Sequence, residues 1–337
     1  MRKVINTLKP YDPSIVDVKI DLHANEVNTN LNLFLKDNIL PSLNRYPDHQ
    51  GEALRHKLQD IYGYNPNTII IGSGSSELLE LMVKTFVDTN DVVLSLEPTF
   101  VMYQHYTVIH GGTYVSIPYS TNTLDDLYNA YVEKKPALIF ISNPNNPTGD
   151  YIKKEDLIDF IQQVSCPIVI DEAYIEYVDE KESLAYDIQQ YPNLYVTRTF
   201  SKAFALAGAR LGYMVSQQEN IQNLKLAKTP YSVSTLSLAL GIEALNQKEI
   251  MQTIISSIIK TRNEMFQYLQ QFPLIVSPSY GNFLYLYEPN KDLYALLLNK
   301  SIYIRSYQNG YYRMSIGTTD EMQEVKKAFK EIYHDTI

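Results

Sequence analysis

The sequence is poor in cysteine, because Cys166 is the only one among its 337 residues. A single cysteine allows no disulfide within the chain and no CxxC metal site. This excludes the small secreted scaffolds that disulfides hold together. It favours a reducing compartment, and we predict the cytoplasm.

Long hydrophobic runs and basic runs are also missing. The apolar runs are no longer than a strand, and the amino-terminal MRKVINTLKPYDP reaches Pro10 and Pro13 without the apolar stretch of a signal peptide. The formal net charge is -9, and no cluster of lysine and arginine is present to displace counterions from nucleic-acid phosphates. We therefore expect no membrane span, no export and no nucleic-acid partner.

Short apolar runs alternate with helical patterns between about residues 67 and 216. The runs are TIIIGS, DVVLSLEP, TYVSIPY, ALIFISNP, CPIVIDEAY, NLYVTRTF and LGYMVS, and amphipathic stretches such as SSELLELMVKTFV separate several of them. Continuous β-branched runs are typical of buried strands, so we predict an α/β fold with a mostly parallel sheet and helices on both faces. Ligands of such a sheet bind at the carboxyl ends of its strands.

The pattern changes after Thr235 to a long helical segment, in which Met251 and Ile258 belong to an apolar series at helical spacing. Beyond it, two strand-like and two helical runs predict a small α+β domain. A chain of 337 residues exceeds what one core of about 250–300 residues holds. We therefore predict an amino-terminal arm that is part of the small domain over residues 1–39, a large domain over 40–246, and a connecting helix with the small domain over 247–337.

The segment IIIGSGSSE, residues 69–77, reads as a strand, a glycine-serine turn and the start of a helix. Free N–H groups at a helix start, together with the helix dipole, suit a phosphate. The spacing matches neither the Rossmann fingerprint nor the P-loop. The alternative is a plain glycine turn with a serine N-cap.

Two further segments place polar side chains at strand ends. ISNPNNPTGDY, residues 141–151, is either an ordinary strand-ending loop or a rigid turn that fixes the Asn146 amide toward a ligand. IVIDEAYIEY, residues 168–177, ends an apolar strand at Asp171, whose buried charge needs a partner. That carboxylate is either a helix N-cap or the partner of a protonated ligand nitrogen, and Tyr174 could reach the same ligand.

The segment TFSKAFALAGARLGY places Lys202 near Arg210 in an apolar, glycine-containing setting. Lysines are most often exposed at the surface, but a lysine near another cation and away from water holds a free amine that can form a Schiff base. Arg210, between Gly208 and Gly212, suits a phosphate through its planar guanidinium. An aldehyde, a phosphate and a basic ring nitrogen on one ligand describe pyridoxal 5'-phosphate.

Seven motifs in order resemble class I/II aminotransferases of fold type I, most closely the histidinol-phosphate aminotransferases. They are LNRYPD, GSGSSELLEL, EPTFVMY, NPNNPTG, DEAYIEY, SKAFALAGARLGY and YYRMSIG, and they extend over essentially the whole chain. The resemblance implies a pyridoxal-phosphate enzyme whose large domain, residues 40–246, binds the cofactor. It also implies a homodimer with shared active sites.

The resemblance assigns roles to the cofactor-site residues. Lys202 would bind the cofactor aldehyde and shuttle a proton, while Asp171 would keep the ring nitrogen protonated. The remaining positions would hydrogen-bond the phenolic oxygen (Asn146, Tyr174), stack on the ring (Phe100), hold the phosphate (Ser75, Ser76, Ser201, Arg210) and reach the partner's cofactor phosphate (Tyr46).

The resemblance also assigns substrate contacts. Arg313 would bind the carboxylate of an amino or keto acid, and Asn25 lies near the substrate in the family. Arg305 and Tyr11 match positions that face the substrate phosphate, although a strand arginine such as Arg305 often makes only a surface ion pair. This chain departs from the family in having Ser76 where aspartate is usual and Phe100 where tyrosine is common, and LHANEV lacks a second asparagine.

The function that this resemblance implies is reversible amino transfer between L-histidinol phosphate and 2-oxoglutarate, a step of histidine biosynthesis. Two alternatives keep the fold and the cofactor: an aromatic amino-acid aminotransferase and a phosphothreonine decarboxylase. A third alternative is a non-catalytic pyridoxal-phosphate sensor. The acidic chain begins almost directly with the family's amino-terminal arm and shows no DNA-binding module, which disfavours such a regulator.

Overall fold

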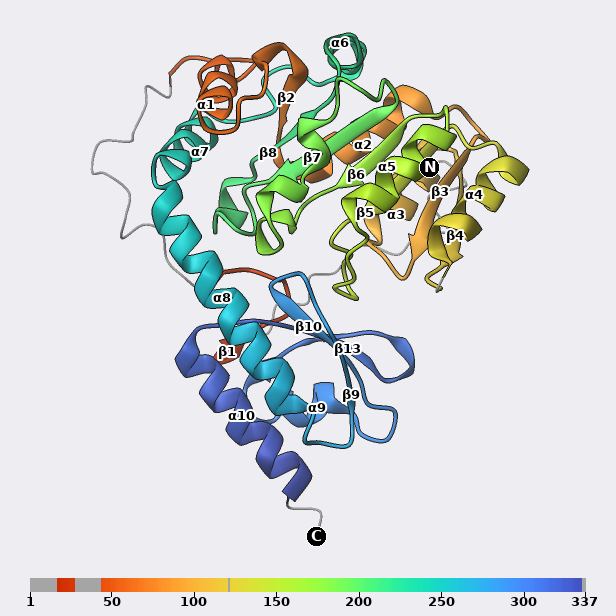
Figure 1. The fold of residues 1–337 in the computed structure, drawn as a ribbon. Coiled ribbons are helices and arrows are strands. Elements are labelled where there is room, and N and C mark those ends of the chain that lie inside the picture. The colour runs from red at the N-terminus through yellow and green to blue at the C-terminus, as the bar shows by residue number, and fades with distance from the viewer. Residues whose placement is uncertain (1–16, 28–43, 121, 335–337) are drawn as a thin grey trace.

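The computed structural model describes residues 17–27, 44–120 and 122–334. The larger part of the molecule is built around a seven-stranded sheet in the order β2-β8-β7-β6-β5-β3-β4 (Figure 1). The strands are β2 (Ile69–Gly72), β3 (Val92–Glu97), β4 (Thr113–Pro118), β5 (Leu138–Ser142), β6 (Ile168–Asp171), β7 (Leu194–Thr199) and β8 (Gly212–Val215). Only β8 runs antiparallel to its neighbours, so the prediction of a mostly parallel sheet is confirmed.

Helices cover both faces of this sheet because most strand residues are apolar and point to both faces. On one face the odd-numbered residues of the β6 strand, such as Val169, join a core with α2 (Gly74–Phe86), α3 (Met102–His110) and α6 (Gln218–Ala227). On the other face the even-numbered Ile168 and Ile170 join a core with three other helices. Those helices are α1 (Glu52–Tyr62), α4 (Thr123–Lys134) and α5 (Lys154–Gln163).

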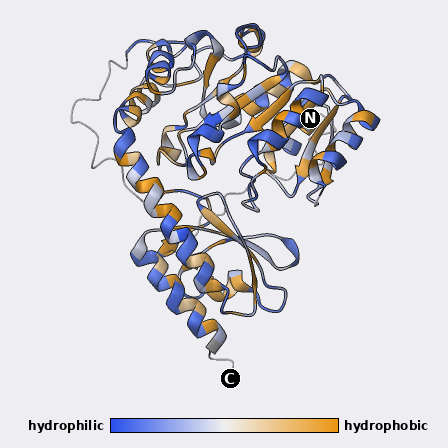
Figure 2. Cartoon of the chain, viewed as in Figure 1, coloured by the Kyte–Doolittle hydropathy of each residue, from blue (hydrophilic) through white to orange (hydrophobic). Residues whose placement is uncertain are grey.

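The helical segment after Thr235 is two helices rather than one. α7 (Thr235–Asn246) ends at Gln247, which leaves helical geometry, and α8 (Lys248–Leu269) continues from there. Figure 1 shows α8 running from the body that holds the seven-stranded sheet to a second, smaller body. The mixed apolar and polar colouring along α8 in Figure 2 fits a helix that packs on one side only.

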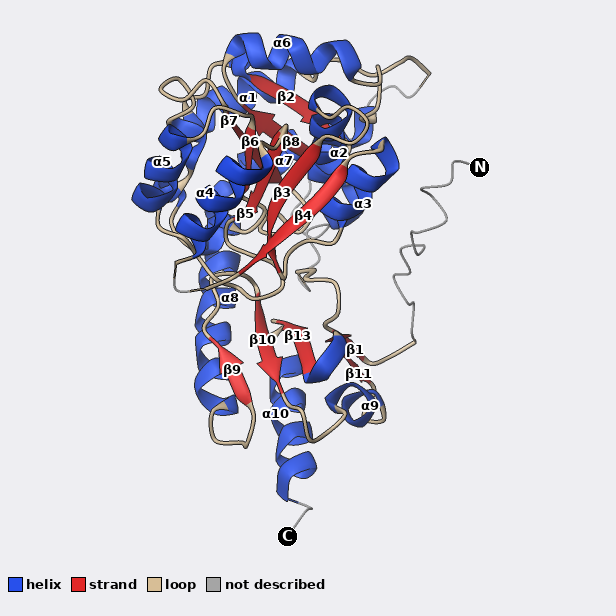
Figure 3. Ribbon diagram, turned by 90° about the vertical axis from the view of Figure 1, so that its right-hand side faces the viewer, coloured by secondary structure: helices blue, strands red, loops and turns tan. Residues whose placement is uncertain are grey.

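The smaller body contains a four-stranded antiparallel sheet in the order β12-β13-β10-β9. Figure 3 shows this body in a view turned by 90° from that of Figure 1. Its strands are β9 (Ile275–Ser277), β10 (Phe283–Tyr287), β12 (Arg305–Ser306) and β13 (Tyr311–Ser315), and its helices are α9 (Leu293–Leu298) and α10 (Thr319–His334). This content matches the predicted α+β unit. The exact domain boundaries stay a prediction.

The amino-terminal segment belongs with this smaller body. β1 (Ile20–Asp21) pairs in parallel with β11 (Ile302–Tyr303), more than 270 residues along the chain. Across the described ranges, no helix is both long and apolar enough to cross a membrane.

Candidate active site

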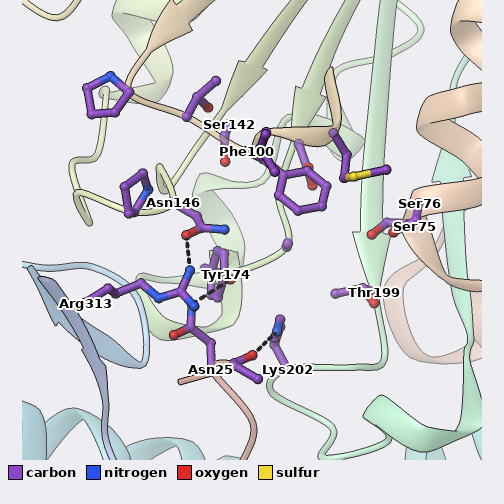
Figure 4. Close-up of a pocket in the computed structure, with 18 of the residues that line it drawn as sticks. Asn25, Ser75, Ser76, Phe100, Ser142, Asn146, Tyr174, Thr199, Lys202 and Arg313 are labelled. Carbon is purple, nitrogen blue, oxygen red and sulfur yellow. Dashed lines mark hydrogen bonds between the residues drawn. The ribbon is translucent and has the colours of Figure 1, made fainter. Parts of the chain in front are cut away.

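A cavity of about 870 Å³ lies where the carboxyl ends of the large-sheet strands meet the smaller body. Strand-end residues of β3, β5, β6 and β7 line it, as the topology of a parallel sheet predicts. Figure 4 shows how side chains from distant segments point into this space. The predicted site residues that line the cavity are Asn25, Ser75, Ser76, Phe100, Asn146, Asp171, Tyr174, Ser201, Lys202, Arg210, Arg305 and Arg313.

Of the other two predicted site residues, Tyr46 lies away from the cavity. Tyr46 is 82% exposed and stacks on Tyr231 with 4.8 Å between the ring centroids, and it is not among the lining residues. Its placement leaves the predicted role at a neighbouring subunit open. Tyr11 lies outside the described residues.

Asp171 ends β6 with its carboxylate buried. Its Oδ2 atom accepts a hydrogen bond of 2.8 Å from the Tyr103 hydroxyl, whereas its Oδ1 atom has no partner. Tyr174, and not Asp171, is the N-cap residue of the following 3-10 helix (Ile175–Tyr177), so the N-cap alternative is wrong. Burial raises the pKa of Asp171 to about 6, against the effect of the Tyr103 hydrogen bond. A buried oxygen without a partner fits a ligand that presents an N–H group.

Tyr103 is a site residue that the sequence analysis missed. It is fully buried on α3, stacks on Phe140 with 4.7 Å between ring centroids, and presents only its hydroxyl to Asp171. Tyr103 stands in the quoted motif EPTFVMY, three residues after Phe100, but α3 begins only at Met102, so no shared helix face marked it.

The amino-terminal turn of α2 forms an anion cradle. Ser73 precedes α2 without making a side-chain cap, and its N–H donates instead to the Glu77 carboxylate. The N–H groups of Ser75 and Ser76 therefore stay available at the positive end of the helix, where an anion is stabilised. Ser73 is the N-cap residue, as in the serine N-cap alternative, but its side chain makes no capping hydrogen bond.

Arg210, two residues before the start of β8, adds its guanidinium to the cradle at the α2 turn. Its Nη1 atom lies 3.5 Å from the Ser201 hydroxyl oxygen, and Gly74 leaves room for the guanidinium, because a Cβ at Gly74 would lie 2.6 Å from Nη2. Gly212 allows β8 to approach the α2 turn, since a Cβ there would lie 2.5 Å from the Ser75 nitrogen. At Gly208, by contrast, a Cβ would meet nothing within 4 Å, so only one of the two flanking glycines serves close packing.

Lys202 lies half-buried between these groups. Its Nζ atom donates to the Ala24 carbonyl at 3.0 Å and lies 5.9 Å from the centre of the Tyr174 ring. Burial and the charges of Arg313 and Arg210 lower the pKa of Lys202 to about 7, although Glu26 and Asp171 act in the opposite direction. The lowered pKa favours the neutral, nucleophilic amine of Lys202, which is not a plain surface lysine.

This pKa predicts how Lys202 reacts with an amine-directed label in the ligand-free protein. The labelling rate should rise with pH through about 7 and then level off, because the neutral amine is the reacting form. Mass spectrometry of the peptide that holds Lys202 measures this rate. An Arg313→Met variant should move the midpoint upward, since a neighbouring cation is lost. A rate that still climbs steeply between pH 8 and 10 in both proteins would contradict the account.

The NPNNPTG loop presents Asn146 to the cavity by holding its other asparagines elsewhere. Asn145 is fully buried and donates to the Pro98 carbonyl and the Thr148 hydroxyl. Asn143 exchanges hydrogen bonds with the backbone of Ile152. The loop is thus fixed on both sides, which supports the reading of a rigid turn over that of an ordinary loop.

Arg313 connects the smaller body to this loop. Its guanidinium donates to Asn146 Oδ1 at 2.5 Å and to the His23 carbonyl at 2.6 Å, and its Nε atom is buried without a partner. Arg313 is only 7% exposed and no carboxylate pairs with it among the described residues. A buried guanidinium with spare N–H groups suits a carboxylate ligand.

Asn25 holds Tyr174 in place. Its Nδ2 atom donates to the Tyr174 hydroxyl at 3.0 Å, and its Oδ1 atom accepts from the Ser315 hydroxyl at 3.0 Å. Asn282 donates to the Asn25 carbonyl. The amino-terminal segment therefore takes part in the site through side chains that β10 and β13 position.

The sequence profile of the family described as "Aminotransferase class I and II" matches residues 18–329. The chain belongs to this family. Among class I and II aminotransferases, it is 32% identical to the histidinol-phosphate aminotransferase of Clostridium novyi, over 99% of this chain and 97% of that protein. It is 33% identical to the histidinol-phosphate aminotransferase of Caldanaerobacter subterraneus, over 98% of each chain.

A solved structure is similar to this aminotransferase over its whole length. It is the histidinol-phosphate aminotransferase of Sinorhizobium meliloti in complex with pyridoxal-5'-phosphate, which superposes with a TM-score of 0.91 at 25% sequence identity. The match covers 100% of this chain and 98% of that chain. The predicted fold type is confirmed by this similarity.

Proposed function

We propose that this class I and II aminotransferase uses pyridoxal phosphate to transfer the amino group between L-histidinol phosphate and 2-oxoglutarate, a step of histidine biosynthesis. The observation that carries the proposal is the pairing of Arg305 on β12 directly opposite Arg313 on β13. Two like charges at opposed strand positions repel each other unless anions bind them. Both side chains line the same cavity as Lys202, so a substrate pair that brings a phosphate and a carboxylate fits this site.

The cofactor fits the groups that the cavity leaves unsatisfied. The ring nitrogen would meet the unpartnered Oδ1 of Asp171, and the phosphate would lie at the α2 amino terminus with Ser201 and Arg210. Phe100 projects into the cavity, where it can cover the ring (Figure 4). Bound pyridoxal phosphate supplies an aldehyde that takes up the amino group and a ring that accepts the electron pair released at the donor carbon.

The chain's own residues then have distinct tasks. Lys202 would hold the cofactor through its amine and, as the free amine, would take the proton from the carbon that bears the amino group. Asp171 would keep a proton on the ring nitrogen by its opposite charge. Asn146 and Tyr174 would orient the ring through its phenolic oxygen.

Substrate binding is divided between the two opposed arginines. Histidinol phosphate has no carboxylate, so Arg305 would bind its phosphate while Arg313 binds the carboxylate of 2-oxoglutarate or glutamate. Asn146 Oδ1 and the His23 carbonyl hold Arg313 in the absence of substrate. Tyr11 stays a predicted phosphate contact.

Replacing Arg305 by alanine tests the phosphate assignment. We expect kcat/KM for histidinol phosphate to fall about 10- to 100-fold, mainly through KM, because a charged hydrogen-bonding partner of the phosphate is lost. Steady-state kinetics with glutamate formation as the readout measure this change. An unchanged KM for histidinol phosphate would show that Arg305 does not bind the substrate phosphate.

Gly212 tests the phosphate cradle of the cofactor. A Gly212→Ala side chain would press on the backbone of Gly74 and Ser75 and displace the α2 turn. We expect the Kd for pyridoxal phosphate to rise about 10-fold, since overpacking costs roughly 1–3 kcal/mol. Gly208→Ala is the matched control, because its Cβ meets nothing within 4 Å. Equal Kd values for the two variants would argue against the cradle.

We further propose that the enzyme is a homodimer with shared active sites in the cytoplasm. Tyr46 supports the dimer: it is largely exposed, stacked on the exposed Tyr231, and turned to a surface other than its own cavity. Sedimentation analysis tests the assembly. A fully active monomer would contradict the role of Tyr46 at the partner's cofactor.

A further inference from the structure

His23 is a cavity residue to which the proposed function gives no side-chain role. His23 lines the cavity with 16% of its side chain exposed, and its ring packs on Tyr303 with 4.5 Å between ring centroids. Its backbone carbonyl already holds Arg313. The imidazole is thus fixed in position at the cavity wall.

Asp21 orients the His23 ring. The Asp21 carboxylate contacts His23 Nδ1 and also accepts the backbone N–H of His23 at 3.1 Å. A carboxylate at Nδ1 requires a proton there, so the ring's other nitrogen, Nε2, is the one left for a ligand. To donate to an anion from Nε2 while Nδ1 donates to Asp21, the ring needs a proton on each nitrogen.

His23 and Arg305 lie at corresponding positions beyond the end of one strand pair. Asp21 of β1 is the register partner of Tyr303 of β11, and His23 and Arg305 each follow two residues later. Both side chains line the same cavity, together with Tyr307. The ring contacts Asp21 on its own segment and Tyr303 on β11, while Arg313 on β13 binds the His23 carbonyl and Arg305 on β12 lines the same cavity.

We propose that His23, oriented by Asp21, binds the phosphate of the amino donor together with Arg305 and so determines the preference for phosphorylated donors. This inference rests on the proposed function. A donor pair that differs only in the phosphate, histidinol phosphate and histidinol, separates this role from a general structural one.

The first experiment compares wild-type enzyme, His23→Ala and His23→Gln with both donors. We expect His23→Ala to lower kcat/KM for histidinol phosphate about 10- to 100-fold, chiefly by raising KM. This fold-loss in kcat/KM should be at least about ten times larger than the fold-loss that the same variant shows with histidinol. Glutamine places an amide donor near the position of Nε2, so His23→Gln should recover part of the loss. Equal losses with both donors would overturn the proposal.

A double-mutant cycle tests whether His23 and Arg305 share one phosphate. If they do, the losses of His23→Ala and Arg305→Ala on histidinol phosphate should be non-additive. Inorganic phosphate, used as a competitive inhibitor, should likewise bind more weakly to His23→Ala. Additive losses and an unchanged inhibition constant would assign His23 to a different task.

The same data distinguish failure of this inference from failure of the proposed function. If wild-type enzyme does not prefer histidinol phosphate to histidinol, the proposed function fails and the inference fails with it. If wild-type enzyme has that preference and His23→Ala retains it in full, only the inference is wrong.

Discussion

Replacement of Lys202 by alanine is expected to abolish nearly all amino transfer. The variant loses the amine that attaches the cofactor and the base that moves the proton, and the proton transfer alone accounts for on the order of 10²–10⁴-fold in rate. Nζ of Lys202 is the amine with a pKa near 7 that faces the cavity. Single-turnover measurements with histidinol phosphate give the residual rate.

The attachment itself is measured separately. Borohydride reduction of the cofactor-loaded wild-type enzyme should leave a pyridoxyl group on Lys202, which mass spectrometry locates. The Lys202→Ala protein should fold with a melting temperature no lower than that of the wild type. Burial disfavours the charged amine of Lys202 in the folded protein, and the substitution removes that amine. Wild-type turnover by this variant would overturn the mechanism.

Replacement of Asp171 by asparagine is expected to lower kcat about 10²–10³-fold and to weaken cofactor binding. The amide cannot carry the negative charge that stabilises a protonated ring nitrogen, and loss of one such electrostatic contact typically costs that much. Because the pKa of Asp171 lies near 6 in the ligand-free chain, cofactor affinity of the wild type should also fall as pH drops below about 6. Steady-state kinetics measure kcat. Fluorescence titration with pyridoxal phosphate measures the cofactor affinity of the variant and the pH dependence of the wild-type affinity.

Glu172 provides the matched control for Asp171. It is the next residue, it is equally buried, and its carboxylate accepts hydrogen bonds from Ser183 and the Leu184 N–H. It does not line the cavity. Glu172→Gln should therefore change stability more than cofactor affinity, and a cofactor Kd that rises as much as in Asp171→Asn would remove the special role of Asp171.

Much of the large sheet could be read from the sequence because its strands are buried on both faces. Each apolar run between residues 67 and 216 corresponds to one strand, from Ile69 in β2 to Val215 in β8. Since the carboxyl ends of parallel strands meet at one edge, the motifs that follow these runs were expected to converge. The cavity brings together Asp171, Asn146 and Lys202 as that reasoning predicts.

The remaining features depend on contacts between distant segments, which no local pattern encodes. The hydrogen bond from Tyr103 to Asp171 joins residues 68 positions apart. The opposition of Arg305 and Arg313 depends on a strand register that two short β-strands set. The sequence analysis did not predict the break at Gln247, although the polar run from Asn246 to Glu249 interrupts the apolar spacing there.

The measurement that tests the account most directly is a glutamate-production assay with 2-oxoglutarate. It compares kcat/KM for histidinol phosphate, histidinol and phenylalanine on the purified, cofactor-loaded enzyme. The account predicts a strong preference for histidinol phosphate over both other donors. Equal or better use of phenylalanine would contradict the proposed substrate and indicate an aromatic amino-acid aminotransferase, and release of CO₂ from phosphothreonine without glutamate would indicate a decarboxylase.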